Sequence, residues 1–286
     1  MKGAPIAQRI RDEVAAAVTG LKARGVHPHL AFVVPAGDPG AAYYGEAQKR
    51  ACEKAGIGHG IHVLSSLPSQ AGLVAEITRL AADPVVTGII VHSPMPAPLD
   101  LVAARERALP PDMDVEAVLP QSCGLLASGV IRQVPCTAAA VLELMKAVDV
   151  PFAGKDAVIV GRSVTVGRPL ALLLLADKKG PTVTVCHSAT GDLAAHARRA
   201  DFLVAAIGKP GFITADMVKP GAVVIDVGTN AVKRPDGTEA TVGDVAFDSV
   251  APLCAAITPV PGGVGPVTTA CLLRNVVTCA RLLFPE

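Results

Sequence analysis

The sequence predicts an α/β protein with two parallel sheets, each covered by helices on both faces. Short apolar runs alternate along the chain with longer stretches whose composition suits helices. These runs are apolar nearly throughout, as in strands buried on both faces, and the stretches between them allow right-handed crossovers. The predicted strands are 30–34, 60–64, 88–91, 157–160, 182–186, 202–207 and 222–227. At 286 residues, the chain is long enough for two such sheets in two domains.

The composition excludes several classes of function. The formal net charge is +1 and Lys and Arg are spread along the chain, so we expect no nucleic-acid partner and no membrane partner. No apolar run approaches the roughly 18 residues that span a bilayer, and residues 1–19 have an amphipathic pattern rather than a signal peptide. The seven cysteines contain no C-x-x-C pair, which argues against disulfides and against a metal site. We therefore expect a cytoplasmic protein with small-molecule partners.

Two boundaries divide the predicted elements. The first lies within the helix-like segment 137–148, before Pro151 and the strand at 157–160. The alternation of strands and helices after it fits a nucleotide-binding, Rossmann-like doubly wound sheet. A turn signal at 233–238 predicts a hairpin within this part. The predicted segments are 1–148, 149–262 and 263–286.

The loop at 258–268 is a candidate for the active site. It contains three prolines and three glycines in eleven positions, and the helix-like run 269–283 follows at once. Proline restricts φ and glycine allows close backbone approach, so this composition suits a rigid strap against a flat ligand at a helix start. The alternative is a plain connector, but simple connectors are usually about 2 to 6 residues long.

A glycine-rich turn predicts a dinucleotide site. Gly161 and Gly167 bracket a loop that follows the strand at 157–160 and precedes a helix, the context that a dinucleotide fingerprint requires. The middle glycine of the fingerprint is replaced by Ser163. The helix start can receive a pyrophosphate through its backbone N–H groups. A tight turn of packing glycines without a ligand is the alternative.

The next strand predicts the type of cofactor. An NAD-preferring site usually ends this strand with an acidic residue that binds the ribose 2′-hydroxyl. Here the strand ends in Cys186, His187 and Ser188, without a carboxylate. Arg162 and Ser188 can hold a 2′-phosphate by charge and hydrogen bonding. The sequence therefore favours NADP over NAD.

Several segments together resemble the bifunctional methylenetetrahydrofolate dehydrogenase/cyclohydrolase family. They are Tyr44 with the helix after it, 88–96, 111–116, 135–137, 160–169, 186–188, 224–228 and 258–268. The resemblance implies a folate-binding catalytic domain at 1–148, an NADP-binding domain at 149–262 and an active-site cleft between them. It also implies a C-terminal helix, 263–286, that packs back on the first domain, and a homodimer.

The resemblance assigns roles to individual residues. The expected catalytic residues are Tyr44, Gln48, His92 and Glu116. The expected folate-binding residues are Tyr44, Glu116, Pro261, Gly262 and Gly263. The expected NADP-binding residues are Gly161, Arg162, Ser163, Gly167, His187, Ser188, Gly208, Lys209, Pro210, Gly228, Thr229 and Thr268. No metal ligand is expected.

The chain departs from the family pattern on the folate side. The family has a lysine four residues after the tyrosine, on the same helix face, and this chain has Gln48. Lys49 cannot replace it, because a fifth-residue spacing turns the side chain away. His92 stands for a glutamine, and Glu116 stands for the aspartate that binds the pterin. Ala117 stands for the glycine that follows.

These departures affect two reactions differently. Hydride transfer to nicotinamide chiefly needs two bound partners in position, because the cofactor carries the chemistry. Hydrolysis of the methenyl cation needs a general base, worth roughly 10² to 10⁴ in rate, and the neutral amide of Gln48 cannot accept a proton. We therefore expect an NADP-dependent 5,10-methylenetetrahydrofolate dehydrogenase with weak or absent cyclohydrolase activity. The alternatives are a fully bifunctional enzyme with His92 as base, and a repurposed or catalytically silent folate- or NADP-binding paralogue.

Overall fold

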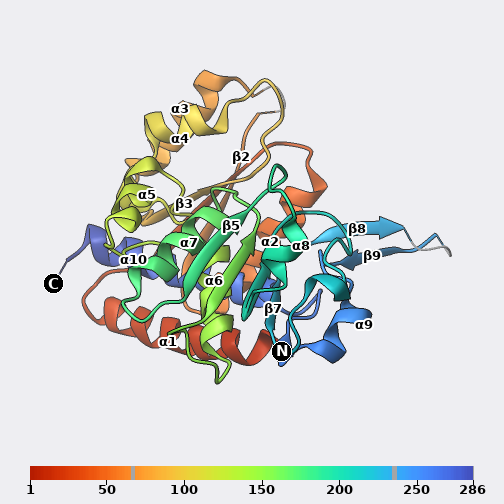
Figure 1. Ribbon diagram of the computed structural model, residues 1–286. Coiled ribbons are helices and arrows are strands. Elements are labelled where there is room, and N and C mark those ends of the chain that lie inside the picture. The colour runs from red at the N-terminus through yellow and green to blue at the C-terminus, as the bar shows by residue number, and fades with distance from the viewer. Residues whose placement is uncertain (66–67, 234–236, 286) are drawn as a thin grey trace. The chain divides into compact units, whose positions relative to one another are not determined.

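The computed structural model describes residues 1–65, 68–233 and 237–285, which form two compact units. Each unit contains a parallel sheet with helices connecting its strands (Figure 1), so the predicted α/β fold is confirmed. Unit 1 comprises Met1–Gln8, Leu126–Val130 and Pro135–Cys271. Unit 2 comprises Arg9–Leu125, Ile131–Val134 and Leu272–Glu286.

Unit 2 is built on a three-stranded parallel sheet with the order β2-β1-β3. Its strands are β1 (His29–Val34), β2 (Gly58–Val63) and β3 (Gly88–Val91). Strand β2 begins two residues before the predicted 60–64, because Gly58 already pairs with His29 of the central strand. The helical elements that lie wholly in this unit are α2 (Pro39–Lys54), α3 (Gln70–Ala81), α4 (Leu101–Ala108) and the 3₁₀ turn η1 (Pro111–Met113).

Local signals explain where helix α2 starts and how closely it packs. Asp38 is its N-cap, and the Asp38 carboxylate accepts a hydrogen bond of 2.9 Å from the amide of Ala41. Pro39 occupies the first turn, where its missing N–H costs nothing. A Cβ on Gly45 would lie 3.2 Å from the Phe32 ring of β1. Gly45 therefore lets α2 approach the sheet closely.

Unit 1 is built on a five-stranded parallel sheet with the order β10-β7-β6-β4-β5. The strands are β4 (Asp156–Val160), β5 (Thr182–Cys186), β6 (Phe202–Ala205), β7 (Val223–Asp226) and the short β10 (Ala256–Ile257), which the sequence did not predict. The chain order reverses at β4, which lies between β5 and β6. In doubly wound sheets, ligands bind at the carboxyl ends of the strands at this reversal.

The other elements of unit 1 connect and extend this sheet. The helical elements are α6 (Cys136–Lys146), α7 (Gly167–Ala176), α8 (Leu193–Ala197), α9 (Phe247–Val250), η2 (Ala215–Met217) and η3 (Ala251–Leu253). The predicted hairpin is formed by antiparallel β8 (Asn230–Lys233) and β9 (Glu239–Val242). Its turn was predicted at 233–238, of which 234–236 lie outside the described residues.

Three helices contribute residues to both units: α1 (Ala4–Ala23), α5 (Pro120–Ala127) and α10 (Val264–Leu283). Helix α10 starts five residues before the predicted 269, so the second half of the loop at 258–268 is helical. Pro266 lies in its first turn, where a proline N–H is not needed. The domain boundaries predicted from the sequence stay a prediction.

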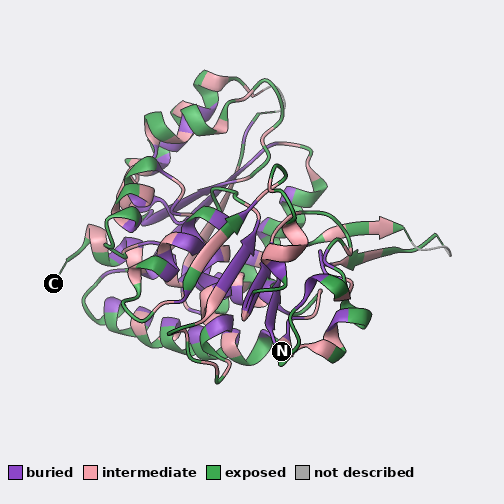
Figure 2. Ribbon diagram, in the orientation of Figure 1, coloured by how far each residue is buried: buried purple, intermediate pink, exposed green. Residues whose placement is uncertain are grey.

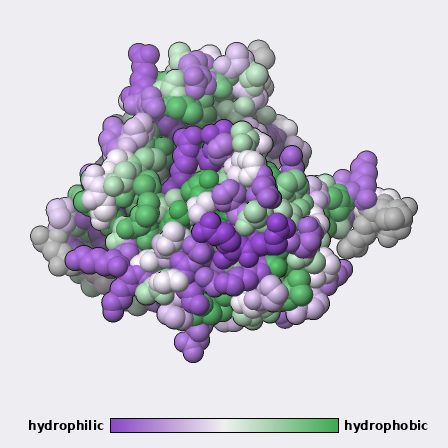
Figure 3. All heavy atoms as spheres, in the orientation of Figure 1, coloured by the Kyte–Doolittle hydropathy of each residue, from purple (hydrophilic) through white to green (hydrophobic). Residues whose placement is uncertain are grey.

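The burial pattern follows the two sheets. In unit 1, strands β6 and β7 are buried along their whole length, and Figure 2 shows buried strands beneath more exposed helices. In unit 2, β3 and nearly all of β1 are buried, whereas the edge strand β2 is only half-buried. Hydrophilic and hydrophobic residues are interspersed on the face in Figure 3. Among the described helices, none is long and apolar enough to cross a membrane.

Candidate active site

Phe32 of unit 2 contacts two of the predicted catalytic residues. Phe32 of β1 contacts Tyr44 of α2 edge-on, with ring centroids 5.9 Å apart. The same Phe32 ring contacts His92, with centroids 6.1 Å apart. His92 directly follows β3, and its amide donates to the Val33 carbonyl at 2.9 Å. Tyr44 of α2 and His92 at the end of β3 thus contact the same ring of the central strand β1.

Gln48 lies one turn after Tyr44 on helix α2. Gln48 is only 2% exposed. Neither its amide nitrogen nor its amide oxygen has a hydrogen-bond partner among the described residues. A buried polar group without a partner costs about 1–3 kcal/mol. The neighbouring Lys49 is exposed, as the fifth-residue spacing requires. The position therefore holds a neutral amide in a buried environment.

Asp38 is a candidate site residue that the sequence analysis missed. Its Oδ2 lies 3.6 Å from Nε2 of His92, while its carboxylate also caps α2. Asp38 also lines a pocket of about 380 Å³ formed by the loops that follow β1 and β3. The Asp-Pro helix start was readable in the sequence as a cap. The approach to His92 was not readable, because it depends on which strands are neighbours.

Glu116 is held by a second residue that the sequence analysis missed. Nη2 of Arg105, from α4, donates to Oε2 of Glu116 and also to the carbonyl of Val91 at 2.8 Å. Val91 precedes His92, so Glu116 is tied to the end of β3. Burial raises the pKa of Glu116 to about 7, Arg105 opposes this shift, and the nearby Asp114 adds to it. A charged partner was not predictable from the spacing of these residues alone.

Ala117 adopts a backbone conformation that glycine would take more easily. Its φ is +53°, in the left-handed region that residues with a Cβ rarely adopt. Its amide donates to the Asp114 carbonyl at 3.2 Å, and Asp114 in turn accepts from the Leu119 amide at 2.9 Å. The turn after Glu116 therefore keeps the shape of a glycine turn although the glycine is absent.

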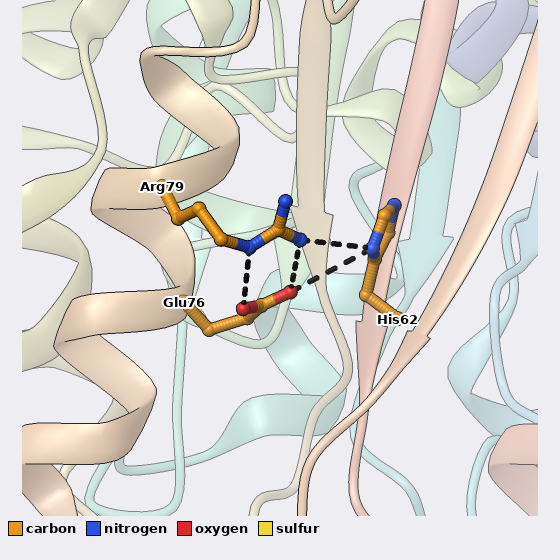
Figure 4. A network of polar contacts seen from close by, with 3 residues as sticks. All are labelled: His62, Glu76 and Arg79. Atoms are coloured by element: carbon orange, nitrogen blue, oxygen red, sulfur yellow. Dashed lines mark hydrogen bonds and ion pairs between the residues drawn. The ribbon is translucent and has the colours of Figure 1, made fainter.

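A further polar cluster lies on α3 and β2 of the same unit (Figure 4). Arg79 donates two hydrogen bonds to Glu76, at 2.6 and 3.0 Å, and its Nη2 lies 3.3 Å from Nδ1 of His62. Nε2 of His62 is buried without a hydrogen-bond partner among the described residues. None of these residues was predicted as a site residue.

In unit 1, the predicted glycine-rich turn requires its glycines. Gly161 follows β4 with φ +132°, and a Cβ there would lie 2.2 Å from the Ala206 carbonyl oxygen. A Cβ on Gly167 would lie 1.9 Å from the Gly161 carbonyl oxygen. Ser163 stabilises the turn, because its Oγ accepts from the Val166 amide at 3.1 Å. The turn brings backbone against the start of α7, as a bound pyrophosphate requires.

The residues expected at the ribose phosphate lie at the ends of two neighbouring strands. Arg162 follows β4 and Ser188 follows β5, and both are exposed. His187 is half-buried, and its Nδ1 accepts from the Ala189 amide at 3.2 Å. An exposed guanidinium and an exposed hydroxyl fit the 2′-phosphate of NADP better than the uncharged ribose hydroxyl of NAD, because both groups donate hydrogen bonds and the guanidinium carries a positive charge.

A buried carboxylate that was not predicted shapes the loop after β6. Asp244 is fully buried and accepts from the amides of Ile207, Gly208 and Lys209 at 2.6, 2.9 and 2.9 Å. A Cβ on Gly228 would lie 2.4 Å from the Asp244 carboxyl carbon. The predicted cofactor residues Gly208, Lys209, Pro210, Gly228 and Thr229 thus lie on loops that pack around or adjoin Asp244.

The proline- and glycine-rich loop is held by backbone contacts. The Gly262 carbonyl accepts from the Gly3 amide at 2.9 Å, and Gly262 has φ +99°. A Cβ on Gly263 would lie 2.6 Å from the Pro259 carbonyl oxygen. Pro261 and Gly262 are exposed, whereas Gly263 is buried. Thr268 lies within α10 and donates to the Val264 carbonyl at 3.2 Å.

Comparison with known proteins agrees with this arrangement. Residues 1–116 match the tetrahydrofolate dehydrogenase/cyclohydrolase catalytic domain, and residues 135–283 match the NAD(P)-binding domain of that family. The chain is 48% identical over 281 residues to the bifunctional protein FolD of Parafrankia sp. (strain EAN1pec), covering 98% of both chains.

Two solved structures are similar over nearly the whole chain. The bifunctional enzyme FolD of Campylobacter jejuni has a TM-score of 0.92 and 37% identity, covering 99% of this chain and 98% of that one. The Trypanosoma brucei enzyme, complexed with NADP and an inhibitor, has a TM-score of 0.92 and 35% identity, covering 100% and 98%. The expectation of NADP as the cofactor is confirmed by these comparisons. The chain belongs to the tetrahydrofolate dehydrogenase/cyclohydrolase family.

Proposed function

We propose that this protein is an NADP-dependent 5,10-methylenetetrahydrofolate dehydrogenase whose cyclohydrolase activity is weak or absent. The observation that carries the proposal is the buried, unpaired amide of Gln48 on the helix face of Tyr44. An amide orients water or substrate through its hydrogen bonds, but it does not accept a proton at neutral pH. Water attack on the methenyl product therefore lacks the base that the family's lysine would supply.

The dehydrogenase reaction does not depend on that base. When bound, NADP supplies the hydride acceptor, and the protein's part is to hold the two partners in position. Tyr44 offers a ring for the aromatic part of the folate, and Glu116 offers a carboxylate for its pterin. Gly161 and Gly167 leave room for the pyrophosphate, and Arg162 with Ser188 favours the 2′-phosphate of NADP over NAD.

The remaining expectations from the sequence belong to the same proposal. Residues 1–148 would bind the folate, 149–262 would bind NADP, and 263–286 would pack on the folate-binding part. The loop residues Pro261, Gly262 and Gly263 would contact the folate, and Thr268 would contact NADP. We also propose a cytoplasmic homodimer. Gel filtration with light scattering tests the dimer, which a monomer at micromolar concentration would contradict.

A side-by-side assay of both half-reactions tests the function. NADPH formation from 5,10-methylenetetrahydrofolate is compared with hydrolysis of supplied 5,10-methenyltetrahydrofolate without NADP. We expect oxidation to exceed hydrolysis, and Gln48→Lys to raise hydrolysis by about 10²-fold or more while oxidation changes little. Lys49→Gln, on the exposed neighbour, is the matched control and should change neither rate.

Two results would contradict the proposal. Hydrolysis by the natural chain at the rate of oxidation would mean that Gln48 is not the missing base position. NADP binding without any reduction across folate concentrations would instead favour a catalytically silent or repurposed paralogue.

A second candidate, the fully bifunctional enzyme, is favoured by the contact between Asp38 and His92. A carboxylate 3.6 Å from Nε2 can hold the His92 ring in place while its other ring nitrogen acts as the base. Asp38→Asn removes the charge but keeps the helix cap, because asparagine caps as well as aspartate. If His92 is the base, this variant and His92→Gln lower hydrolysis at least about tenfold and shift its pH profile. Asp100→Asn, at the cap of α4, is the control.

A further inference from the structure

Arg105 on helix α4 is a charged residue whose side chain is largely buried. Its side chain is 11% exposed, and one nitrogen, Nη2, reaches both the Val91 carbonyl at the end of β3 and the Glu116 carboxylate. The next arginine on the helix, Arg107, is exposed. A guanidinium is costly to bury unless its partners are well placed. The Arg105 guanidinium therefore interacts with groups of unit 2 rather than with solvent.

The charged groups that face Glu116 come from two elements. Arg105 lies on α4, and Asp114 lies on the segment that follows η1. Asp114 is 1% exposed and is itself held by backbone amides. Asp114 disfavours the ionised form of Glu116, while Arg105 favours it. Of the two neighbours, Arg105 is thus the one that favours the ionised form of Glu116, against the effect of burial.

We propose that Arg105 is a positioning residue for the folate: it holds the Glu116 carboxylate at the end of β3 and favours its ionised form, ready for the donor edge of the pterin. This inference rests on the proposed function. The extra methylene of Glu116, compared with the aspartate of the family, lets the carboxylate reach Arg105. The departure at Glu116 and its contact with Arg105 then form one recognition element.

The hydrogen-bonding capacity of the pair supports this role. An ionised carboxylate has about four acceptor sites on its two oxygens. Arg105 uses Oε2, which leaves Oε1 and further sites on Oε2 for the amino and ring N–H donors of a 2-amino-4-oxopyrimidine. A protonated Glu116 would instead present its own O–H to those donors and lose one of the two acceptors. Folate binding should therefore follow the ionisation of Glu116.

The first test compares Arg105→Met with the control Arg107→Met, on the exposed face of the same helix. At pH 7 we expect Arg105→Met to raise the KM for 5,10-methylenetetrahydrofolate about tenfold, with kcat and the Kd for NADP changing less than about twofold. Arg107→Met should leave all three values unchanged. An unchanged KM in a folded Arg105→Met protein would overturn the inference.

The pH profile separates positioning from a merely structural role. Without Arg105 the pKa of Glu116 rises further, so the KM of Arg105→Met should fall toward that of the natural chain as the pH is raised to about 9. A structural lesion would raise the KM equally at every pH, and this result would overturn the inference. Glu116→Gln removes the titrating group, so adding Arg105→Met to it should introduce no pH dependence.

A second variant and a direct titration complement these tests. If Arg105→Met does not fold, Arg105→Lys keeps the charge but loses the planar fork, and its KM should rise about threefold. An unchanged KM would count against the inference. Carboxyl ¹³C NMR of the unliganded protein reads the pKa of Glu116 directly, and it should be higher in Arg105→Met.

The failure of the inference is distinguishable from the failure of the proposed function. If the natural chain neither binds tetrahydrofolate nor forms NADPH, the proposed function fails, and the folate role of Arg105 fails with it. If the natural chain turns over but neither the KM profile nor the NMR titration responds to Arg105→Met, only the inference fails.

Discussion

The two units differ in how completely their buried polar side chains are paired. In unit 1, Asp226 and Asp244 are almost fully buried, and both accept several backbone hydrogen bonds. In unit 2, by contrast, some buried side-chain atoms have no hydrogen-bond partner. Among the described residues, all such atoms lie in this unit. They belong to Gln48, His59, His62 and Arg132.

We interpret unit 1 as a structural framework, and unit 2 as a part whose unpaired polar groups complete their hydrogen bonds when a ligand binds. A buried carboxylate whose hydrogen bonds are all satisfied fixes the backbone loops around it. An unpaired buried amide or imidazole is costly for the free protein and becomes favourable only when a partner is bound. The family departures Gln48, His92 and Glu116 all fall in unit 2, and among them Gln48 is buried without a hydrogen-bond partner in the described part of the chain.

The largest effect should come from removing one of the hydrogen-bonded buried carboxylates of unit 1. Asp244→Ala leaves the amides of Ile207, Gly208 and Lys209 without their acceptor, which should lower the free energy of unfolding by about 4 kcal/mol or more. NADP binding should be lost as well. Denaturant unfolding and calorimetric titration with NADP measure the two effects. Asp216→Ala, an exposed aspartate in the same unit, is the control and should change stability by less than about 0.5 kcal/mol.

A smaller effect should appear as a pH dependence in unit 2. Burial lowers the pKa of His59 to about 4, with further lowering by His29, Lys49 and His62 and an opposing effect of Glu46. Since the unfolded chain binds a proton near pH 6.5, the contribution of His59 to stability is complete above that pH. It is lost progressively as the pH falls toward 4.

At pH 5 this loss should amount to about 2 kcal/mol relative to pH 7.5. His59→Leu should remove that part of the pH dependence, measured by denaturant unfolding at both pH values. His27→Gln, on an exposed histidine, should leave the difference as it is in the natural chain. An equal pH dependence in all three proteins would show that the ring of His59 is solvated or paired.

The smallest effect should appear when two buried glutamines of unit 2, one unpaired and one hydrogen-bonded, are replaced in turn. Gln48 and Gln133 are both buried glutamines of unit 2, but Gln133 donates to the Pro111 carbonyl at 3.0 Å. Gln48→Met should therefore raise the free energy of unfolding by about 1 kcal/mol, whereas Gln133→Met should lower it by about 1–2 kcal/mol. Denaturant unfolding measures both. If the two variants lose stability alike, Gln48 is paired after all.

Much of unit 1 could be predicted from the sequence, because its signals are local. A strand, a glycine-rich turn and a helix follow one another from Asp156 to Ala176. Within this segment, glycine is required by the φ of +132° at Gly161 and by the Gly161 carbonyl that a Cβ on Gly167 would meet. The apolar runs likewise predicted the strands to within a few residues. The position of Gln48 one turn after Tyr44 also followed from helix geometry alone.

Only the tertiary structure decided which residues meet from distant parts of the chain. Asp38 lies beside His92 because β1 and β3 are neighbours, and Arg105 meets Glu116 because α4 returns along the end of β3. Asp244 shapes the loop of Gly208 from a position that follows a hairpin. Sequence patterns report the period and the ends of single elements, whereas charge pairs between elements depend on sheet order and packing, which no single segment encodes.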